Sequence, residues 1–410
     1  MKAQMVALGD LYQIGSSKRV LKSQWKTEGV PFYRGREITR LAADGFVENE
    51  LFISEEHFAE LAAQSGVPNT GDIVITAIGT IGNAHIVRDL DRFYFKDASV
   101  LWMKRTSDVS SEFINLWLKS PLFFDQLDRG NGATVDTLTI QKLQSVRLCI
   151  PTPAEQQRIV AILDEAFASI DRARAAAEQN RQNARALFES HLQSVFSQQG
   201  EGWREATVGQ LVRDGVIAKP QDGNHGEIHP TKADYVEVGI PFVMAADLLG
   251  GRVDTKGCRF ISEQQARSLR IGFSVDQDVL LSHKGTIGRV AILEADQEFV
   301  MLTPQVTYYR VLKKSEISNH YLYFYFHSPK FRSQIEHVAG AGSTRAYIGI
   351  TKQLDLKILL PPIAIQQQLA VQLKGLQDES RHLESLYMRK LTALDELKQS
   401  LLHQAFSGNL

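Results

Sequence analysis

Few residues in this chain have the types and spacing that catalysis or metal binding requires. The stretch HGEIH places His225 and His229 four residues apart, as two metal ligands on one helix face would be. The glycines and the proline around them predict a loop instead, and no cysteine is near, so we expect no metal site. His283 and Lys284 are polar neighbours, but no nucleophile with an orienting carboxylate accompanies them.

The usual signatures of cofactor and substrate chemistry are also missing. The sequence contains no G-x-x-x-x-G-K-[ST] phosphate loop, no G-x-G-x-x-G after a strand and no H-E-x-x-H. It also lacks the G-x-S-x-G turn that carries a nucleophilic serine. We therefore expect a binding protein that has no cofactor.

One four-residue stretch that could contact a ligand occurs twice. GTIG stands at Gly79–Gly82 and again at Gly285–Gly288, each time between two runs of β-forming residues. Gly-x-x-Gly between strands is typical of a tight turn, in which glycine supplies a positive φ. A loop with so little bulk also lets backbone N–H groups and the hydroxyl of Thr80 or Thr286 approach a phosphate. The turn is the favoured interpretation, and both can hold together.

The residues beside GTIG differ between its two occurrences. Lys284 precedes the second GTIG and Arg289 follows it, which favours contact with phosphate. Ile78 and Asn83 flank the first GTIG and give no such support.

The two GTIG stretches belong to a tandem duplication with an offset of about 210 residues. Further stretches align in the same order, which chance does not readily produce. The aligned pairs are 29–38 with 239–248, 51–56 with 259–264, 71–82 with 276–288, 132–143 with 342–354, 149–160 with 359–370, and 194–197 with 404–407.

Each copy is expected to hold a mixed α/β domain followed by a long helix. Runs such as DIVITAI and DVLLSHK predict strands, and residues 112–127 and 319–335 predict helical stretches between strands. No Pro or Gly occurs in 154–197, and only Gly375 occurs in 364–407, so each segment predicts a helix of up to roughly 65 Å. The expected domains are 1–150 and 200–360, with helical segments at 151–199 and 361–410.

The two long helices are predicted to pair with each other as an antiparallel coiled coil. One helix is alanine-rich and the other leucine-rich, and the chain leaves the first domain along one and returns along the other. The alternative is that each helix packs on its own domain. The positions predicted for the seam are Ile159, Leu163, Ala166, Ile170, Ala173, Ala177, Ala184 and Leu187 in the first helix, and Leu369, Leu373, Leu376, Leu383, Tyr387, Leu394, Leu397 and Leu401 in the second.

Composition bounds the remaining possibilities. The chain has 410 residues, 43% of them hydrophobic and 23% charged, which is typical of a soluble protein with two or three domains. No apolar run is long enough to span a bilayer and no signal peptide is visible, so we expect a cytoplasmic protein without a membrane segment. Cys149 and Cys258 are too few and too far apart for a disulfide framework. The net charge of −1 requires that any surface for nucleic acid arise from local segregation of charge.

Taken together, these features resemble the specificity subunit of type I restriction–modification systems. The likeness is carried by the paired GTIG turns after a [GQ]-D-[IV]-[VL] strand, by the G-x-T segments at 132–134 and 342–344, and by the helix starts PTPAEQQRI and PPIAIQQQL. These motifs lie in both copies, so the resemblance covers the whole chain. The second copy departs from the pattern at Ile365, where the first copy has Glu155.

The resemblance implies an α/β protein with two pseudo-symmetric target-recognition domains separated by two long antiparallel helices. Each domain would read one half of an asymmetric, split target in double-stranded DNA. The helices would set the unread spacer and dock two methyltransferase subunits, with restriction subunits joining through the complex. The chain itself would be a non-catalytic subunit in DNA methylation and host defence.

The residues that we expect to contact DNA are basic or polar residues in loops and around GTIG. A solvated surface is the competing interpretation for the basic cluster of the first copy, and Tyr323, Phe324 and Phe326 are expected in the core rather than stacked on bases. The candidates are Lys18, Arg19, Lys22, Lys26, Arg34, Arg36, Thr80 and Thr134 in the first copy, and Lys219, Asn224, His283, Lys284, Thr286, Arg289, Ser343, Thr344, Arg345 and Tyr347 in the second.

Two other functional classes compete with DNA recognition. A duplicated scaffold that binds protein or peptide would have the same two domains and rigid helices, and the neutral net charge permits it. An enzyme such as a fused methyltransferase is disfavoured, because neither a cofactor glycine motif nor an N-P-P-[YF] signature occurs.

Overall fold

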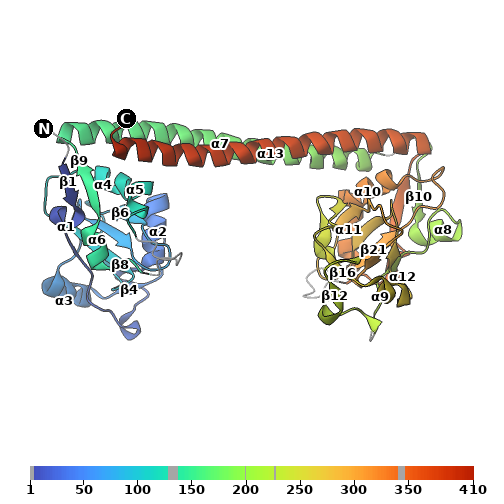
Figure 1. Cartoon of the computed structure of the whole chain (residues 1–410), viewed down its shortest axis with the longest axis horizontal. Helices are drawn as coiled ribbons and strands as arrows, with labels where there is room; N and C mark the ends of the chain where they lie inside the picture. The colour runs from blue at the N-terminus through green and yellow to red at the C-terminus, as the bar shows by residue number, and fades with distance from the viewer. Residues whose placement is uncertain (1–3, 128–136, 199, 226–227, 340–346) are drawn as a thin grey trace. The chain divides into compact units, whose positions relative to one another are not determined.

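The computed structural model describes residues 4–127, 137–198, 200–225, 228–339 and 347–410 (Figure 1). The chain divides into two compact units. Unit 1 is Met1–Glu178 with Met388–Leu410, and unit 2 is Gln179–Tyr387. Each unit contains part of both long helices, α7 (Pro153–Ser197) and α13 (Ile363–Ser407). In the described part of the chain, no helix is both long and apolar enough to cross a membrane.

The described strands of unit 1 form a four-stranded sheet in the order β2-β8-β5-β6, a three-stranded sheet β4-β3-β7, and the pair β1-β9. All pairings are antiparallel except β3 with β7. The strands are β1 Gln4–Ala7, β2 Tyr12–Gly15, β3 Val30–Tyr33, β4 Phe52–Ile53, β5 Ile73–Thr76, β6 Ala84–Ile86, β7 Tyr94–Phe95, β8 Val100–Arg105 and β9 Arg147–Ile150. The shorter helices are α1 Leu8–Leu11, α2 Gly35–Asp44, α3 Glu55–Ser65, α4 Ser111–Trp117, α5 Pro121–Phe124 and α6 Ile140–Ser145.

The described strands of unit 2 form larger versions of the same sheets. Their orders are β11-β21-β18-β19-β15-β14 and β12-β16-β13-β20-β17, with the separate pair β10-β22. The strands are β10 Arg204–Thr207, β11 Gln221–Asp222, β12 Tyr235–Val236, β13 Ile240–Val243, β14 Leu248–Leu249, β15 Arg252–Val253, β16 Arg259–Ile261, β17 Phe273–Ser274, β18 Val279–Ser282, β19 Val290–Ile292, β20 Val300–Leu302, β21 Val306–Tyr309 and β22 Lys357–Leu360. The shorter helices are α8 Val208–Arg213, α9 Glu263–Ser268, α10 Asn319–His327, α11 Pro329–Ala339 and α12 Ile350–Gln353.

The strand before each GTIG is buried on both faces of its sheet. In β5, Ile73 and Ile75 pack into the core beneath the long helices, whereas Val74 packs into a second core against α2. In β18, Val279 and Leu281 lie in one core and Leu280 in another. Alternate side chains of a strand point to opposite faces, so an uninterrupted apolar run is the pattern that a doubly covered strand requires. The central strand therefore holds the loop that follows it in a fixed place.

The start of each long helix is joined to its own unit by a buried glutamine. Gln156 accepts a hydrogen bond from the N–H of Ser110 at 2.9 Å and donates one to the carbonyl of Pro151 at 3.0 Å. Gln366 accepts from the N–H of Ser318 at 3.0 Å and donates to the carbonyls of Glu316 and Pro361. The repeated glutamines of the two helix starts thus satisfy backbone groups that the helix would otherwise bury unpaired.

Within each unit the segments of α7 and α13 run antiparallel and in contact (Figure 1). In unit 1, Arg174 bonds to Asp395, and Lys398 approaches Asp171 at 3.5 Å. In unit 2, the hydroxyl of Ser380 donates to the carbonyl of Ala184 at 2.8 Å. The helix ends also enter the domain cores, Leu163 with Leu402 in unit 1 and Leu192 with Leu373 in unit 2. Pairing and packing on the domains therefore occur together.

The helical stretches predicted at 112–127 and 319–335 are confirmed, and each contains two helices, because Ser120 and Ser328 stand before a proline that begins a new helix. The predicted seam of the long helices was wrong at two positions. Leu187 and Leu397, which the heptad spacing placed in the seam, are exposed. The buried positions move by steps of four at these points, since an α-helix has 3.6 rather than 3.5 residues per turn. Tyr323, Phe324 and Phe326 are buried in the core, as expected.

Candidate nucleic-acid interface

Both GTIG stretches are tight turns with the same geometry. The φ angles are +79° and +94° at Gly79 and Gly82, and +77° and +86° at Gly285 and Gly288. The N–H of the second glycine donates to the carbonyl of the last strand residue, Thr76 or Ser282, at 3.1 and 2.9 Å. The turn interpretation is thus confirmed. The residues at the tip of each loop, 78–80 and 284–286, are exposed.

The two glycines of each turn have different neighbours. A Cβ atom on Gly82 would lie 2.8 Å from the ring of Phe124, and one on Gly288 would lie 3.2 Å from Ile335. A Cβ atom on Gly79 or Gly285 would meet nothing within 4 Å. The first glycine therefore supplies only the positive φ, whereas the second also lets the turn pack closely on α5 or α11.

A distant segment closes against each loop. In unit 1, Thr137 forms a β-bridge with Ile78, and the N–H of Leu138 donates to the carbonyl of Ala77 at 2.7 Å. In unit 2, Tyr347 forms the same bridge with Lys284. The segments that follow the two G-x-T motifs thus end beside the GTIG loops. Thr134, Ser343, Thr344 and Arg345 themselves lie outside the described residues.

A pocket borders each GTIG loop at corresponding places in the two units. Their volumes are about 460 Å³ in unit 1 and about 360 Å³ in unit 2. The correspondence follows from matching backbone bonds, Lys96 N–H to the carbonyl of Tyr33 at 2.7 Å and Thr303 N–H to that of Val243 at 3.0 Å. The unit 1 pocket is lined by Arg34, Gly35, Arg36, Thr39, Arg40, Ile78, Thr80, Lys96 and Ser99. The unit 2 pocket is lined by His225, His229, Tyr235, Phe242, Met244, Lys284, Thr303, Pro304 and Gln305.

The unit 1 pocket is basic, and a buried carboxylate orients part of its charge. Glu37 is almost fully buried and accepts hydrogen bonds from Arg34 at 2.9 Å and from Arg36 at 2.9 Å. Burial acts to raise the pKa of Glu37, but the bonds from Arg34 and then Arg36 outweigh it and lower that pKa to about 2. Arg40 and Lys96 carry exposed charges beside this pair. The arrangement presents a local excess of positive charge despite the neutral chain.

The Glu37 cluster predicts an acid-sensitive contribution to stability. A group whose folded pKa lies below its unfolded value stabilises the fold above the unfolded pKa, and this stabilisation is lost as the pH falls. We expect Glu37→Gln to lower the free energy of unfolding by about 1 to 2 kcal/mol near pH 7. The loss is no larger because Arg36 is half exposed, and solvent weakens its ion pair with Glu37. Thermal midpoints of the original chain and of the Glu37→Gln variant, from pH 7 down to pH 2, measure the difference in stability. The difference should shrink below pH 4.5 and vanish near 2, and a difference independent of pH would contradict it.

The unit 2 pocket differs in chemistry, since it combines aromatic walls with polar atoms that lack partners. Nδ1 of His229 and Oγ1 of Thr303 are buried without a hydrogen bond among the described residues. Nδ2 of Asn224 and Nε2 of His283, which adjoin the lining residues in sequence, are in the same condition. A buried polar atom left unpaired costs about 1 to 3 kcal/mol. These atoms are suited to ordered water or to the polar edge of a ligand.

Two residues predicted to contact DNA lie in the interior of unit 2. His283 is fully buried, its Nδ1–H donates to the carbonyl of Ile348 at 2.9 Å, and its Nε2 is 3.5 Å from the carboxylate of Asp222. Burial lowers the pKa of His283, against the raising effects of Ile348 and Asp222. Asn224 is buried and accepts from the N–H of Ile271 at 3.2 Å. Both side chains are turned into the core beside the loop, so neither is accessible to a duplex in this structure.

The remaining residues predicted to contact DNA lie either around the second GTIG loop or away from both pockets. Lys284 and Thr286 are exposed at the tip of the second loop, and Arg289 donates to the carbonyl of Ala245 at 3.0 Å. Tyr347 is 46% exposed beside Lys284. The exposed basic residues of the β2–β3 connection line neither pocket, and nor does Lys219, two residues before β11; those of the connection are Lys18, Arg19, Lys22 and Lys26.

Several residues of the pockets were not predicted from the sequence. Lys96, His229 and Gln305 reach the pockets from segments far from GTIG in the chain. Lys96 belongs to no basic cluster, and Gln305 is one polar residue in a β-rich stretch. The pairing of β3 with β7 brings Lys96 beside the first loop, and the pairing of β13 with β20 brings Gln305 beside the second.

The fold and the paired sites define a duplicated α/β protein in which each unit presents a GTIG loop beside a pocket. The family model for the type I restriction modification DNA specificity domain matches residues 2–178 and 226–385. The chain therefore belongs to the type I restriction–modification DNA specificity family, and the resemblance found in its sequence is confirmed.

Individual relatives agree with this assignment. A putative type I restriction enzyme specificity subunit from Haemophilus influenzae is 31% identical over 163 residues, which are 40% of each chain. The EcoKI specificity subunit of Escherichia coli is 24% identical over 313 residues, covering 74% of this chain and 66% of the relative. The chain thus spans less than two thirds of the length of these two relatives.

Solved structures share the fold. The HsdS subunit from Thermoanaerobacter tengcongensis superposes with a TM-score of 0.59 at 18% identity, over 100% of this chain and 97% of that one. A chain from a type I restriction–modification system, solved to explain complex assembly and conformational transition, gives a TM-score of 0.79 at 18% identity, over 100% and 98% of the two chains. The predicted α/β fold with two domains and two long helices is confirmed.

Proposed function

We propose that the chain is the DNA-recognition subunit of a type I restriction–modification complex and that each unit reads one half of a split target. The observation that carries the proposal is the pair of equivalent GTIG loops, each beside a pocket with different side chains. The exposed threonine hydroxyls and backbone N–H groups of the loops are suited to phosphate, which fixes register. The pocket side chains are suited to base edges, which carry sequence. Because the two pockets differ, the two half-sites differ.

The contacts that we propose follow the accessible residues. In unit 1 they are made by Arg34, Arg36, Thr80 and Lys96, and in unit 2 by Lys284, Thr286 and Tyr347. Asn224 and His283 support the loop from the interior rather than touch DNA. Lys18, Arg19, Lys22, Lys26 and Lys219 stay candidates for phosphate contacts at the rim, because they are exposed and carry no ion pair in the described part of the chain.

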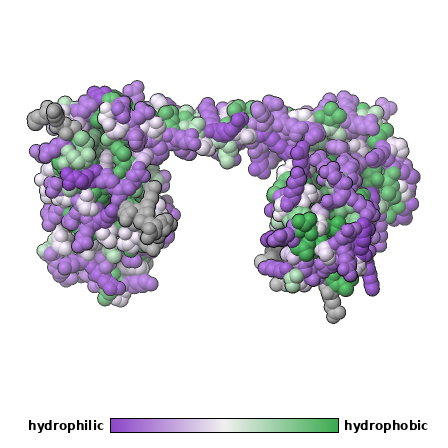
Figure 2. Space-filling view, viewed as in Figure 1, coloured by the Kyte–Doolittle hydropathy of each residue, from purple (hydrophilic) through white to green (hydrophobic). Residues whose placement is uncertain are grey.

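The long helices are proposed to set the unread spacer and to dock methyltransferase subunits. Apolar side chains are exposed along the helical segments of unit 2, namely Leu187, Ile365, Val371 and Leu386. Figure 2 shows scattered hydrophobic residues among hydrophilic ones along the helices. These exposed apolar side chains are available for contact with helices of partner subunits. Partner subunits supply the chemistry in this proposal, and the complex acts on cytoplasmic DNA.

Exchange of one globular domain tests the proposal. Replacing residues 200–360 with those of a relative should change one half of the methylated motif and leave the other half unaltered, because unit 1 keeps its loop and pocket. Sequencing of modified bases in cells with the exchanged and the original chain measures both halves. Exchange of residues 1–150 is the matched control and should change the opposite half. A change in both halves after either exchange would refute separate reading.

A further inference from the structure

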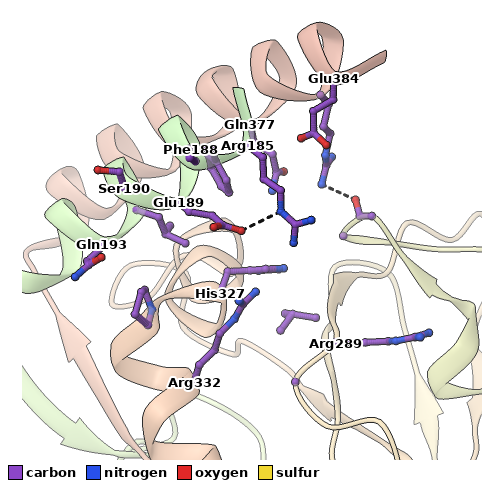
Figure 3. Close-up of a pocket in the computed structure, with 18 of the residues that line it drawn as sticks. Arg185, Phe188, Glu189, Ser190, Gln193, Arg289, His327, Arg332, Gln377 and Glu384 are labelled. Carbon is purple, nitrogen blue, oxygen red and sulfur yellow. Dashed lines mark hydrogen bonds and ion pairs between the residues drawn. The ribbon is translucent and has the colours of Figure 1, made fainter. Parts of the chain in front are cut away.

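Unit 2 contains a second hollow, separate from the pocket beside Lys284. It has a volume of about 770 Å³ and lies between the paired helices and the globular part of the unit (Figure 3). Its walls come from α7, α13, the turn between β14 and β15, the end of the GTIG loop and the junction of α10 with α11. Four arginines line it, Arg185, Arg289, Arg332 and Arg381. We call it the arginine groove.

Positive charge dominates the arginine groove. Arg185 forms an ion pair with Glu189 at 3.1 Å, but both side chains are mostly exposed. Arg381 donates to the carbonyl of Gly250 at 2.6 Å, a neutral acceptor that fixes the guanidinium without cancelling its charge. Within the described part of the chain, no hydrogen bond or ion pair reaches the guanidinium of Arg332, which points toward the hollow in Figure 3. Glu384 is the other lining carboxylate.

The positive charge of the arginine groove also acts on His327, which lines it. Its Nδ1–H donates to the carbonyl of Tyr323 at 2.9 Å, which leaves Nε2 as an unprotonated acceptor. Burial lowers the pKa of His327 to about 4, and the charges of Arg332 and Arg381 contribute, against the raising effect of the Tyr323 carbonyl. The charges of Arg332 and Arg381 therefore both act on His327.

The duplication shows that the scaffold does not need these arginines. The helix starts at Gln156 and Gln366 set the correspondence along the helices, and the GTIG turns and the Ser-Pro junctions set it elsewhere. Unit 1 places other residues at all four positions. Arg185, Arg289, Arg332 and Arg381 correspond to Asp395, Asn83, Phe124 and Asp171 in that order. The two aspartates are engaged by Arg174 and Lys398. The same junction thus closes in unit 1 without an arginine at any of these four positions.

We propose that the arginine groove binds phosphate groups and that these come from the DNA backbone beside the half-site read by unit 2. Guanidinium groups bind phosphate through two parallel hydrogen bonds. Two of those in the groove, Arg289 and Arg381, are held in place by hydrogen bonds to backbone carbonyls. Gly288 and Arg289 connect the groove to the GTIG loop, so a backbone that contacts the loop continues past the groove. This inference rests on the DNA-reading function proposed above and assigns it a phosphate site that unit 1 lacks.

The salt dependence of DNA binding tests the proposal. Each lost phosphate contact reduces the slope of log affinity against log salt by about 0.9. Arg332→Ala with Arg381→Ala, in the full chain assembled with its methyltransferase subunits, should weaken binding about ten- to a hundredfold and flatten the slope by about two, with the methylated motif unchanged. The matched control is Arg389→Ala with Lys390→Ala, which removes two exposed charges from α13 outside the groove. The control should retain the original slope.

A second arm identifies the source of the phosphate. Inorganic phosphate and ADP are titrated by calorimetry into the original chain and the groove variant without DNA. Binding that the variant loses, together with an unchanged DNA slope, would assign the groove to a free nucleotide. Equal DNA slopes for all proteins and no calorimetric binding would overturn the phosphate site. Failure of the original chain to bind any split target would instead refute the DNA-reading function itself.

Discussion

Lengthening both long helices by three heptads is expected to widen the unread gap of the DNA target by about nine base pairs, with both half-sites unchanged. Three heptads add roughly 31 Å at 1.5 Å per residue, and a base pair occupies about 3.4 Å. The inserted heptads repeat residues 171–177 in α7 and 392–398 in α13, which face each other through the pairs Arg174–Asp395 and Asp171–Lys398. Equal insertions keep the buried seam in phase on both helices. Sequencing of modified bases reads the gap directly.

One heptad in each helix is the matched control. It lengthens the gap by about three base pairs, which rotates one half-site by roughly 100° around the duplex because a turn takes about 10.5 base pairs. Modification should then fall at least about tenfold, whereas three heptads come close to a full turn and preserve it. A gap that stays constant in both variants would show that the helices do not measure distance.

The fold could be predicted from the sequence because the duplication tests each element twice. The runs that became β5 and β18 align, and so do the helix starts at Gln156 and Gln366. A stretch that has the same pattern in two diverged copies is constrained by the scaffold rather than by local chance. The unbroken apolar residues of β5 predicted a strand, but only the structure shows that two cores cover its two faces.

The candidate site could be predicted only in part. GTIG was found because glycine is the residue favoured at positive φ, and its two glycines recur with the same spacing in both copies. His283 was misplaced because its neighbour Lys284 is exposed, and alternate residues at the end of a strand face opposite sides. Lys96 and Arg332 were missed because strand pairing and helix docking bring them to their sites from distant segments. A residue-by-residue comparison of the two copies would have found Arg332, because the corresponding residue of unit 1 is Phe124.

The chemical difference between the two units follows from where the copies have diverged. The buried contacts that hold the GTIG loops are shared, from the strand before each loop to the β-bridge that closes it. The residues that line the pockets are not shared, since Arg34 of unit 1 corresponds to Met244 of unit 2 and Lys96 corresponds to Thr303. Under the proposed function, a support shared by both units with altered pocket lining would allow each unit to change its recognised sequence without loss of fold. The arginine groove is a further difference of this kind, in residues that are proposed to contact the DNA backbone.

Substituting Gly82 with alanine is expected to lower the free energy of unfolding of unit 1 by about 2 to 4 kcal/mol. The new Cβ would lie 2.8 Å from the Phe124 ring, so overpacking costs about 1 to 3 kcal/mol. The φ of +94° adds about 1 kcal/mol, because alanine is strained there. Thermal and urea midpoints of the full chain measure the loss. Binding to the unit 1 half-site should weaken as well, because relief of the clash moves the loop away from its pocket.

Gly79→Ala is the matched control, since it has the same sign of φ but no atom within 4 Å of its Cβ. It should cost only about 1 kcal/mol. Truncating Phe124 to alanine in the Gly82→Ala background removes the clash but retains the backbone strain. The double variant should therefore lose less stability than the sum of the two single changes. Strict additivity, or equal losses for Gly79→Ala and Gly82→Ala, would show that close packing of the turn on α5 does not hold the loop in place.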